Sequence, residues 1–286
     1  MVRDIWWDGR NEISICYRII GAKDANFAGM EMERIENVWF RDLRKMDYAT
    51  AWDLQERILA ANCEMKKMRA SASSGHITDK NLETSHHLLF VEHPAVYTLG
   101  KSGKESNVLI GEEERKAKGI AYFRTNRGGD ITFHGPGQVV GYPILDLEKF
   151  YTDIGRYLRN LEQVVIEVMA DYGLQGERSE GETGVWLDPE VKGRERKICA
   201  IGVRCSRWIT MHGFAFNVNT DLAHFQRIIP CGIQDKQVTS LQKELGREVP
   251  MEEVKMRIRE KFSSVFNVRL QLPSSEMNES FKGLWE

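Results

Sequence analysis

Hydrophobic and polar positions along the chain follow two periods. Apolar residues recur every three or four positions over residues 48–69 and 152–172, which is the period of a helix that buries one face. Short apolar runs bounded by glycine, proline or charged residues predict strands at residues 38–40, 86–91, 95–99, 121–124, 139–147, 183–187, 197–203 and 208–218. Shorter helices are expected at residues 112–118, 222–229, 239–245 and 250–266. These elements predict an α/β or α+β domain with a mixed β-sheet flanked by helices.

The two ends of the chain differ from the part between them. Over residues 13–19 apolar side chains alternate as in a strand, but residues 21–26 break the pattern. We therefore expect residues 1–36 to be a separate extension, either poorly ordered or the product of a misassigned start, since Met30 and Met32 are alternative starts. The main domain is expected over residues 37–248, and a C-terminal helix and tail over residues 249–286.

Composition argues against several function classes. The 286 residues include 40 basic and 42 acidic side chains, and the net charge of −2 argues against general binding to nucleic acid. No apolar run is long enough to cross a bilayer, and the N-terminus has no signal-peptide core, so we expect a cytoplasmic protein that binds no membrane. The five cysteines are an odd number without a CxxC pair, which disfavours a disulfide framework or a structural metal site. A single catalytic thiol in a reducing compartment fits better.

Cys231 stands in an unusual context, between Pro230 and Gly232. Proline fixes one backbone dihedral and glycine permits conformations closed to other residues, so this turn can project the thiol into a cleft. A buried, inert cysteine is the alternative. A free thiol has a pKa of ~8.5 and needs a neighbouring cation to become a thiolate at neutral pH. Lys197 is the candidate cation, or else a solvated lysine at the start of a hairpin strand.

A glycine-rich stretch runs from Arg127 to Gln138 with the sequence RGGDITFHGPGQ, in which two turns flank one short strand. Adjacent glycines allow close backbone approach and exposed N–H groups, so the stretch is either a ligand-cradling loop or a tight turn. No GK[ST] follows and the glycine spacing is wrong for a dinucleotide fingerprint, so this is neither a Walker loop nor a Rossmann motif. His134 in this stretch and His212 further along either assist the substrate or the thiol, or are structural.

Together these segments resemble the octanoyl-(acyl-carrier-protein):protein N-octanoyltransferases, also called lipoyl(octanoyl) transferases or the lipoate biosynthesis protein B family. The matching motifs, in the family's order, are RGG to HGPGQ over residues 127–138, KICAIG over 197–202, HGFAFNVN over 212–219 and PCG over 230–232. Several motifs in the right order are far more specific than any one of them. The resemblance covers roughly residues 37–245.

The resemblance implies a catalytic fold shared with lipoate and biotin protein ligases, and a site made by matching residues. Cys231 matches the nucleophile that carries the acyl thioester, and Lys197 matches the lysine that lowers the pKa of that thiol. The residues that match substrate-binding segments are Arg127, Gly128, Gly129, Asp130, Ile131, Thr132, Phe133, His134, Ala200, Ile201, Gly202, Gly213, Phe214 and Ala215. The chain departs from the family twice, with Asn126 where Asp is frequent and Asp130 where Gln is frequent.

The implied reaction moves the octanoyl group from octanoyl-acyl carrier protein to Cys231, and then to the lysine amine of a lipoyl domain. Lipoyl domains of 2-oxoacid dehydrogenases and the glycine cleavage H protein are the implied acceptors, and no ATP, metal or other cofactor is expected. A docking surface for an acidic carrier, or else a solvated turn, is expected at Lys192, Arg194, Arg196, Arg204 and Arg207. Three alternatives stay open: an ATP-dependent lipoate or biotin ligase, a cysteine hydrolase such as a thioesterase or peptidase, and a non-catalytic acyl-binding module.

Overall fold

The structure is a computed structural model, and it describes residues 35–73, 82–229 and 237–272. These residues belong to one compact unit that begins at Ile35. The extension expected at the N-terminus lies outside the described residues, except for the last two of its positions. Cys231 also lies outside the described residues.

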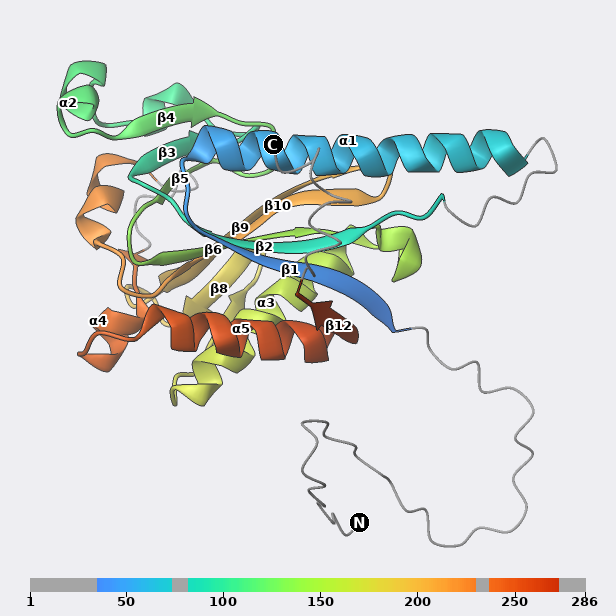
Figure 1. Cartoon of the computed structure of the whole chain (residues 1–286). Helices are drawn as coiled ribbons and strands as arrows, with labels where there is room; N and C mark the ends of the chain where they lie inside the picture. Colours follow the sequence, from blue (N-terminus) through green and yellow to red (C-terminus); the bar gives the residue numbers. More distant parts are fainter. Residues whose placement is uncertain (1–34, 74–81, 230–236, 273–286) are drawn as a thin grey trace, which may run out of the picture. The chain divides into compact units, whose positions relative to one another are not determined.

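A mixed sheet forms the middle layer of this unit (Figure 1). In the described part of the chain it has nine strands. These are β1 (Glu36–Lys45), β2 (His86–Glu92), β6 (Gln138–Ile144), β7 (Glu177–Ser179), β8 (Glu182–Leu187), β9 (Arg196–Ser206), β10 (Ile209–Asn217), β11 (Gln237–Val238) and β12 (Val268–Gln271). Their order is β12-β1-β2-β6-β10-β9-β8-β7, with β11 paired to β9. Parallel pairs join β12, β1 and β2, and also β11 and β9, and the other pairs are antiparallel, so the predicted mixed sheet is confirmed.

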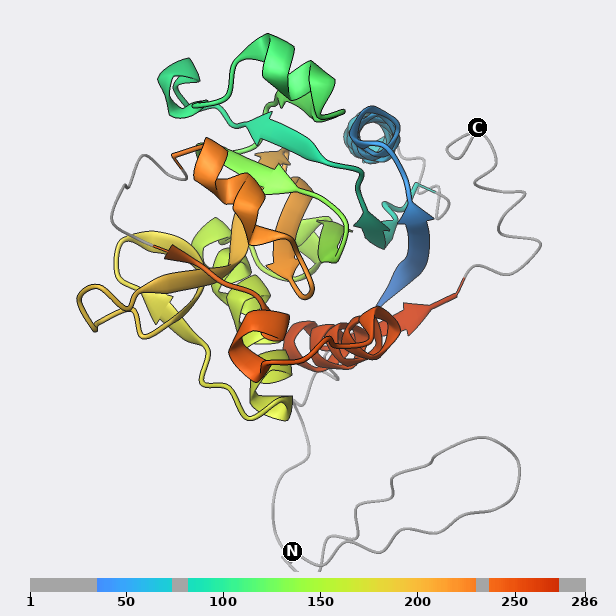
Figure 2. The same ribbon diagram turned by 90° about the vertical axis from the view of Figure 1, so that its left-hand side faces the viewer.

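Helices cover both faces of this sheet (Figure 2). The long helix α1 (Tyr48–Ser73) packs on one face, and α3 (Ile154–Asp171) and α5 (Met251–Phe266) pack on the other. The short helices are α2 (Glu112–Ala117), α4 (Leu241–Leu245) and three 3₁₀ turns, η1 (Glu105–Asn107), η2 (Leu147–Lys149) and η3 (Leu222–Arg227). The helices predicted from the apolar period therefore exist, with ends that shift by a few residues.

Capping side chains fix where the two main helices begin. Asp47 accepts hydrogen bonds from the backbone N–H of Thr50 (2.9 Å) and from its hydroxyl (2.6 Å) at the start of α1. Asp153 accepts from the N–H of Arg156 (2.9 Å) at the start of α3. The helix α3 ends just before Gly173, whose φ of +73° suits a glycine past a helix C-terminus.

Helix α3 buries the face that its apolar period predicts. The fully buried side chains on this face are Tyr157, Leu161, Val164, Val165, Val168 and Met169. Ile154 and Leu158 follow the same apolar period, but they are only partly buried and line the cavity described below. The N-terminal half of α3 thus contributes to both the core and the site.

A smaller three-stranded sheet packs beside the main one. It contains β4 (Ala121–Arg124), β3 (Val96–Leu99) and β5 (Ile131–His134) in that order. Its own apolar cluster includes Tyr97, Phe133 and Ile228. The glycine-rich stretch follows β4, contains β5 and ends at Gln138, the first residue of β6, so it runs from the small sheet to the main one.

The C-terminal elements are part of the same unit as the rest of the fold. Strand β12 pairs in parallel with β1, with Glu36 opposite Val268. Helix α5 packs against α3 through a core that includes Phe262 and Phe266. Residues 249–272 therefore contribute an edge strand to the main sheet and a helix to its core.

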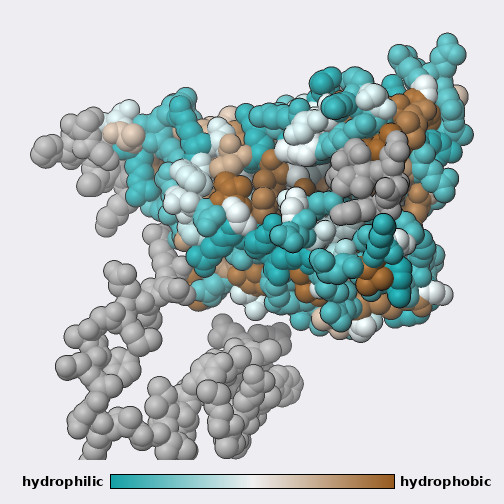
Figure 3. All heavy atoms as spheres, turned by 180° about the vertical axis from the view of Figure 1, so that it is seen from behind, coloured by the Kyte–Doolittle hydropathy of each residue, from teal (hydrophilic) through white to brown (hydrophobic). Residues whose placement is uncertain are grey.

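The surface seen from the back is mostly hydrophilic, with apolar residues showing between the polar ones (Figure 3). Among the described residues, no helix has both the length and the apolar character needed to span a bilayer.

Candidate active site

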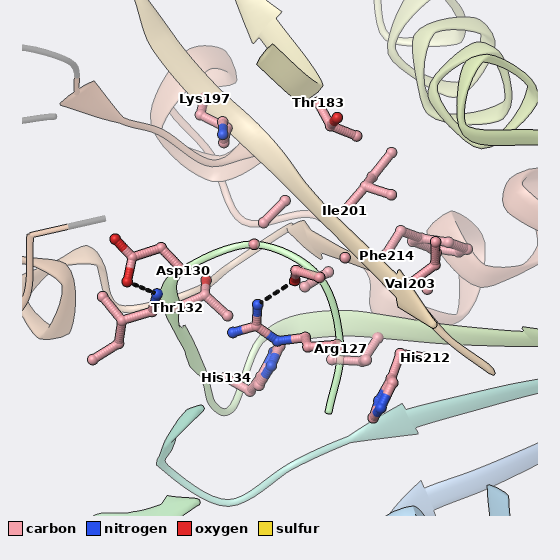
Figure 4. Close-up of a pocket in the computed structure, with 18 of the residues that line it drawn as sticks. Arg127, Asp130, Thr132, His134, Thr183, Lys197, Ile201, Val203, His212 and Phe214 are labelled. Atoms are coloured by element: carbon pink, nitrogen blue, oxygen red, sulfur yellow. Dashed lines mark hydrogen bonds between the residues drawn. The ribbon is translucent and has the colours of Figure 1, made fainter. Parts of the chain in front are cut away.

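A cavity of about 630 Å³ lies between the glycine-rich stretch and the main sheet (Figure 4). Pockets for small molecules commonly measure ~300–1,000 Å³, so its size suits a small ligand. Residues Arg127 to Thr132 form one wall, and strands β9 and β10 form the opposite wall. Two segments that are far apart in the sequence therefore meet across one cavity.

The β9–β10 wall is built from small residues. Ala200 pairs with Ala215, and Gly202 pairs with Gly213. Residues directly opposite each other in an antiparallel pair share a face of the sheet, so these four positions form a shallow floor. A floor without long side chains leaves the volume above it free for a ligand.

The glycine-rich stretch is held close to this floor by backbone hydrogen bonds. Gly128 N–H donates to the carbonyl of Val203 (2.9 Å), and the carbonyl of Arg127 accepts from Lys101 N–H (2.9 Å). A Cβ atom added at Gly202 would lie 2.9 Å from the carbonyl oxygen of Gly128, so only glycine permits this approach. Gly129 has φ +85°, a conformation that favours glycine. Because Gly128 N–H already donates to Val203, it is not available to an oxyanion.

Arg127 is buried at the inner side of the stretch, with 7% exposure. Its Nη2 donates to the carbonyl of Thr98 (2.5 Å) and lies 3.0 Å from the Thr98 hydroxyl. Its Nη1 donates to the carbonyl of Gly128 (3.0 Å). These bonds tie the loop to strand β3 and keep a positive charge beside the cavity.

Both ring nitrogens of His134 have hydrogen-bond partners. Nδ1 lies 2.8 Å from Oε1 of Gln138, and Nε2 lies 3.2 Å from the hydroxyl of Thr98. The amide nitrogen of Gln138 donates to Asn217 (2.8 Å), so its oxygen must accept from His134, which places the proton on Nδ1. Burial, with His93 nearby, holds the pKa of His134 well below its usual range. His134 is therefore a neutral residue that orients Thr98, beside Arg127, and is not free to act as a base.

His212 lies deeper in the site and is also neutral. Its Nε2 lies 2.8 Å from Oδ1 of Asn126, and burial, aided by Arg127 and Arg204, lowers its pKa to about 3. Its strand partner is Val203, six residues along β9 from Lys197, which corresponds to a separation on the order of 20 Å. His212 and Lys197 therefore stand at opposite ends of the cavity.

Lys197 lines the other end of the cavity from β9. Its side chain is 13% exposed, and its Nζ lies 3.8 Å from Oε2 of Glu182 and 4.4 Å from the centre of the Trp186 ring. Its strand partner on β11 is Val238, which lines the same cavity. Phe225 of η3 also lines it. Residues 230–236 connect η3 to β11, so both described flanks of the segment that contains Cys231 reach this cavity.

The structure gathers most of the predicted site residues. Those that line the cavity are Arg127, Gly128, Gly129, Asp130, Ile131, Thr132, His134, Lys197, Ala200, Ile201, Gly202, Gly213, Phe214 and Ala215. Phe133 is not among the lining residues, because its ring stacks on His224 at a centroid distance of 4.3 Å inside the core of the small sheet. Its neighbours in β5, Thr132 and His134, point to the other face of the small sheet and line the cavity.

Several lining residues were not predicted from the sequence. Tyr48, Gln138, Tyr142 and Glu182 all line the cavity. Gln138 is the last residue of the glycine-rich stretch, so its place in that motif was the available signal. Glu182 only precedes the strand expected at residues 183–187, and no motif marks it. Tyr48 begins α1 and reaches the site only through the packing of that helix, so no local pattern marks it.

The other cysteines in the described part of the chain lie away from the cavity lining. Cys199 is fully buried, and burial raises the pKa of its thiol far above the usual range. Burial also raises the pKa of Cys205. Neither thiol is suited to nucleophilic attack.

Within residues 35–73, 82–229 and 237–272, no three His, Cys, Asp or Glu side chains cluster in a way that could hold a metal ion.

Three arginines of the expected docking surface are paired with carboxylates. Arg194 Nη2 lies 3.2 Å from Oδ2 of Asp188, although the Arg194 side chain is 68% exposed. The other two are more buried. Arg196 donates to Glu244 through Nε (2.7 Å) and Nη2 (2.8 Å), and to Asp188 through Nη1 (2.5 Å). Arg204 donates to Glu56 at 2.7 Å. These two arginines hold the fold together, which leaves Lys192 and Arg194 as the more exposed basic side chains of the hairpin.

Comparison with known proteins identifies the family. A family model described as the lipoyl protein ligase A/B catalytic domain matches residues 47–263. The octanoyltransferase of Christiangramia forsetii is 52% identical over 238 residues, which cover 82% of this chain and 98% of the relative. The chain belongs to the octanoyltransferase family. The octanoyltransferase of Flavobacterium johnsoniae is likewise 52% identical, over 82% of this chain and 99% of the relative.

Solved structures of lipoate protein ligases share the fold of this chain. Lipoate-protein ligase A bound with ATP superposes with a TM-score of 0.60 at 16% identity, covering 88% of this chain and 94% of the ligase. A bipartite lipoate protein ligase from Thermoplasma acidophilum gives a TM-score of 0.59 at 18% identity, covering 88% of this chain and 92% of the other. The expected lipoate ligase-like catalytic fold is confirmed, and membership of the octanoyltransferases makes the chain an acyltransferase.

Proposed function

We propose that this octanoyltransferase moves the octanoyl group from octanoyl-acyl carrier protein to Cys231, and from Cys231 to the lysine amine of a lipoyl domain, in the cytoplasm. Lipoyl domains of 2-oxoacid dehydrogenases and the glycine cleavage H protein would be the acceptors. The observation that carries the proposal is the position of Lys197 on the cavity wall, with its strand partner Val238 at the end of the segment that contains Cys231.

In the first half-reaction the Cys231 thiolate attacks the thioester carbonyl of the donor. A C–S bond forms to Cys231, the C–S bond to the carrier's phosphopantetheine breaks, and the departing thiolate takes up a proton. The ammonium group of Lys197 favours the thiolate over the thiol, since an opposite charge nearby stabilises the ionised form. The remaining backbone N–H groups of the glycine-rich stretch would stabilise the oxyanion.

In the second half-reaction the amine of the acceptor lysine attacks the octanoyl thioester. A C–N bond forms, the C–S bond to Cys231 breaks, and the amine proton passes to solvent, or to a neutral Lys197 that gave its own proton to the departing carrier thiolate in the first half-reaction. The amide product is stable, so the transfer is driven forward. No step uses ATP, because the donor thioester already carries an activated acyl group.

The lining of the cavity suits an apolar acyl group. The small floor of β9 and β10 and the side chains of Ile154, Leu158 and Phe214 offer apolar surface along its length. Burial of methylene groups contributes ~0.8 kcal/mol each, so an eight-carbon chain gains several kcal/mol in such a site. The depth of the cavity would then select the chain length.

The deciding experiment is to incubate the protein with octanoyl-acyl carrier protein without acceptor, followed by intact mass measurement and peptide mapping. We expect one octanoyl adduct on Cys231 that a lipoyl domain discharges. Cys231→Ser should abolish the adduct, and Lys197→Met should slow its formation by about 10²-fold, the usual contribution of a positioned acid–base group. Cys205→Ser is the matched control and should react like the parent protein.

Different outcomes separate this proposal from its rivals. Transfer that needs ATP and survives Cys231→Ser would overturn it in favour of a lipoate or biotin ligase. Free octanoate as the main product in the presence of a lipoyl domain would indicate a thioesterase. Retention of octanoate without turnover would indicate a binding module.

A further inference from the structure

Strand β9 carries one extra residue beside Lys197. Val185 of β8 pairs with Cys199, but the next residue, Trp186, pairs with Lys197, so the register skips Ile198. Two residues on one strand against one on its partner is the pattern of a β-bulge. Bulges re-aim side chains, and this one lies directly next to the cationic residue of the site.

The bulge decides which face of the sheet Lys197 occupies. In a regular strand Lys197 and Cys199 would point to the same face, since side chains alternate with a period of two. Cys199 is fully buried in the core against α3. The skipped residue gives Lys197 the opposite face, where it lies over Trp186 and lines the cavity.

Gly184 of β8 leaves room for the Lys197 side chain. Its φ is +126°, and an added Cβ would lie 2.5 Å from the carbonyl oxygen of Cys199 and 3.4 Å from Cε of Lys197. The lysine stem therefore crosses β8 at a position without a side chain. The position of the Gly184 backbone limits where the lysine can go.

A buried carboxylate holds that backbone in place. Glu162 of α3 is completely buried, and its Oε1 accepts from the N–H of Gly184 (2.9 Å). Its Oε2 accepts from Arg159 Nη1 (2.6 Å) and Arg178 Nε (3.1 Å). Burying a carboxylate costs free energy unless its oxygens accept hydrogen bonds. The proposed reaction makes no use of the Glu162 carboxylate. The backbone group that Glu162 binds belongs to Gly184, the residue that accommodates Lys197.

We propose that Glu162 is a positioning residue for Lys197, because it fixes Gly184 and so stabilises the β-bulge that turns the lysine toward the cavity. This inference rests on the proposed function, in which Lys197 promotes formation of the Cys231 thiolate. Glu162 touches no reacting atom and acts only through Gly184.

The test is Glu162→Gln, measured by the pH dependence of Cys231 alkylation with iodoacetamide and by steady-state transfer kinetics. A glutamine can accept from Gly184 or from the arginines, but its NH₂ group then faces another donor, so one contact is lost. We expect the alkylation midpoint to rise by about one pH unit toward ~8.5, and kcat to fall about tenfold with little change in KM. Glu167→Gln, on the same helix and hydrogen-bonded to Gln163 at 3.1 Å, is the matched control and should leave both readouts unchanged.

Lys197→Met separates failure of this inference from failure of the proposed function. If Lys197→Met raises the midpoint and a folded Glu162→Gln does not, the positioning role is overturned and the Cys231–Lys197 pair stands. If Lys197→Met leaves the midpoint unchanged, the pair itself fails and the inference fails with it. Should Glu162→Gln not fold, Glu162→Asp keeps the charge for the arginines but is one methylene too short for Gly184. A folded Glu162→Asp with the parent midpoint would also overturn the proposal.

Discussion

Asn126 joins two ionisable side chains beside the cavity. Its Nδ2 donates to Oε1 of Glu56 (2.7 Å), so its oxygen accepts, and the Nε2 of His212 at 2.8 Å must carry the proton. An amide can donate to one neighbour and accept from the other, whereas a carboxylate can only accept. Asn126, where aspartate is frequent in the family, therefore supplies the donor that the Glu56 carboxylate needs.

At this residue we predict that Asn126→Asp destabilises the protein. The new carboxylate would face Glu56, and Glu56 would lose a donor, which costs about 1–2 kcal/mol at neutral pH. Urea unfolding at pH 7 measures the loss. Glu56→Gln in the same background should recover most of it, because the glutamine can donate to the carboxylate. Additive effects of the two substitutions would show that the pair does not interact.

Among the structural elements, the glycine-rich stretch depends on close contacts with strand β9. Gly202 lies under the carbonyl of Gly128 with no space for a side chain, and Arg127 Cδ would lie 3.2 Å from an added Cβ. The stretch is therefore positioned by the backbone of another strand. The shape of the cavity follows from this packing and not from the loop sequence alone.

At the element scale we predict that Gly202→Ala lifts the stretch from the floor and lowers transfer activity at least tenfold. The folded state should survive, since the loop can move by less than an ångström to accept a methyl group. Thermal unfolding and transfer rates measured on the same preparation separate the two effects. Gly111→Ala is the control, because an added Cβ there has no neighbour within 4 Å. Parent-like activity of Gly202→Ala would show that the close approach is not required.

For the whole molecule, buried histidines make folding stability depend on pH. Burial lowers the pKa of His87 to about 3, of His93 to about 4 and of His212 to about 3. In the unfolded chain each returns to ~6.5. Between these values the unfolded chain binds more protons than the folded one, so stability is lost as the pH falls below ~6.5. Each histidine contributes up to ~1.4 kcal/mol per pH unit in this window.

We therefore expect the free energy of unfolding to fall by several kcal/mol between pH 6.5 and pH 5. The measurement is urea unfolding at half-unit steps of pH. His93→Gln should reduce the slope by about 1 kcal/mol per pH unit, because one proton fewer is taken up on unfolding. His224→Gln, at a side chain that is partly exposed, should change the slope far less. An identical slope in His93→Gln would contradict the assignment.

Local sequence patterns are enough to predict most of the elements and the segments that line the cavity. Helices α1 and α3 follow from an apolar period that repeats locally, and the glycine, lysine and cysteine motifs are visible as residue strings. The small residues at 200, 202, 213 and 215 are assigned to a ligand site by the family resemblance, which rests on the same residue strings. Local pattern suffices for these features because neighbouring residues decide them.

How these segments meet is visible only in the folded chain. The pairing of β12 with β1 joins residues more than 200 positions apart, and no local pattern encodes that contact. The bulge at Ile198 sets the face of Lys197, although strand alternation alone would place it with Cys199. Phe133 lies in the core of the small sheet, and the protonation of His134 and His212 follows from distant amide partners. In each case the outcome depends on register and packing between separate segments, which a linear sequence does not display.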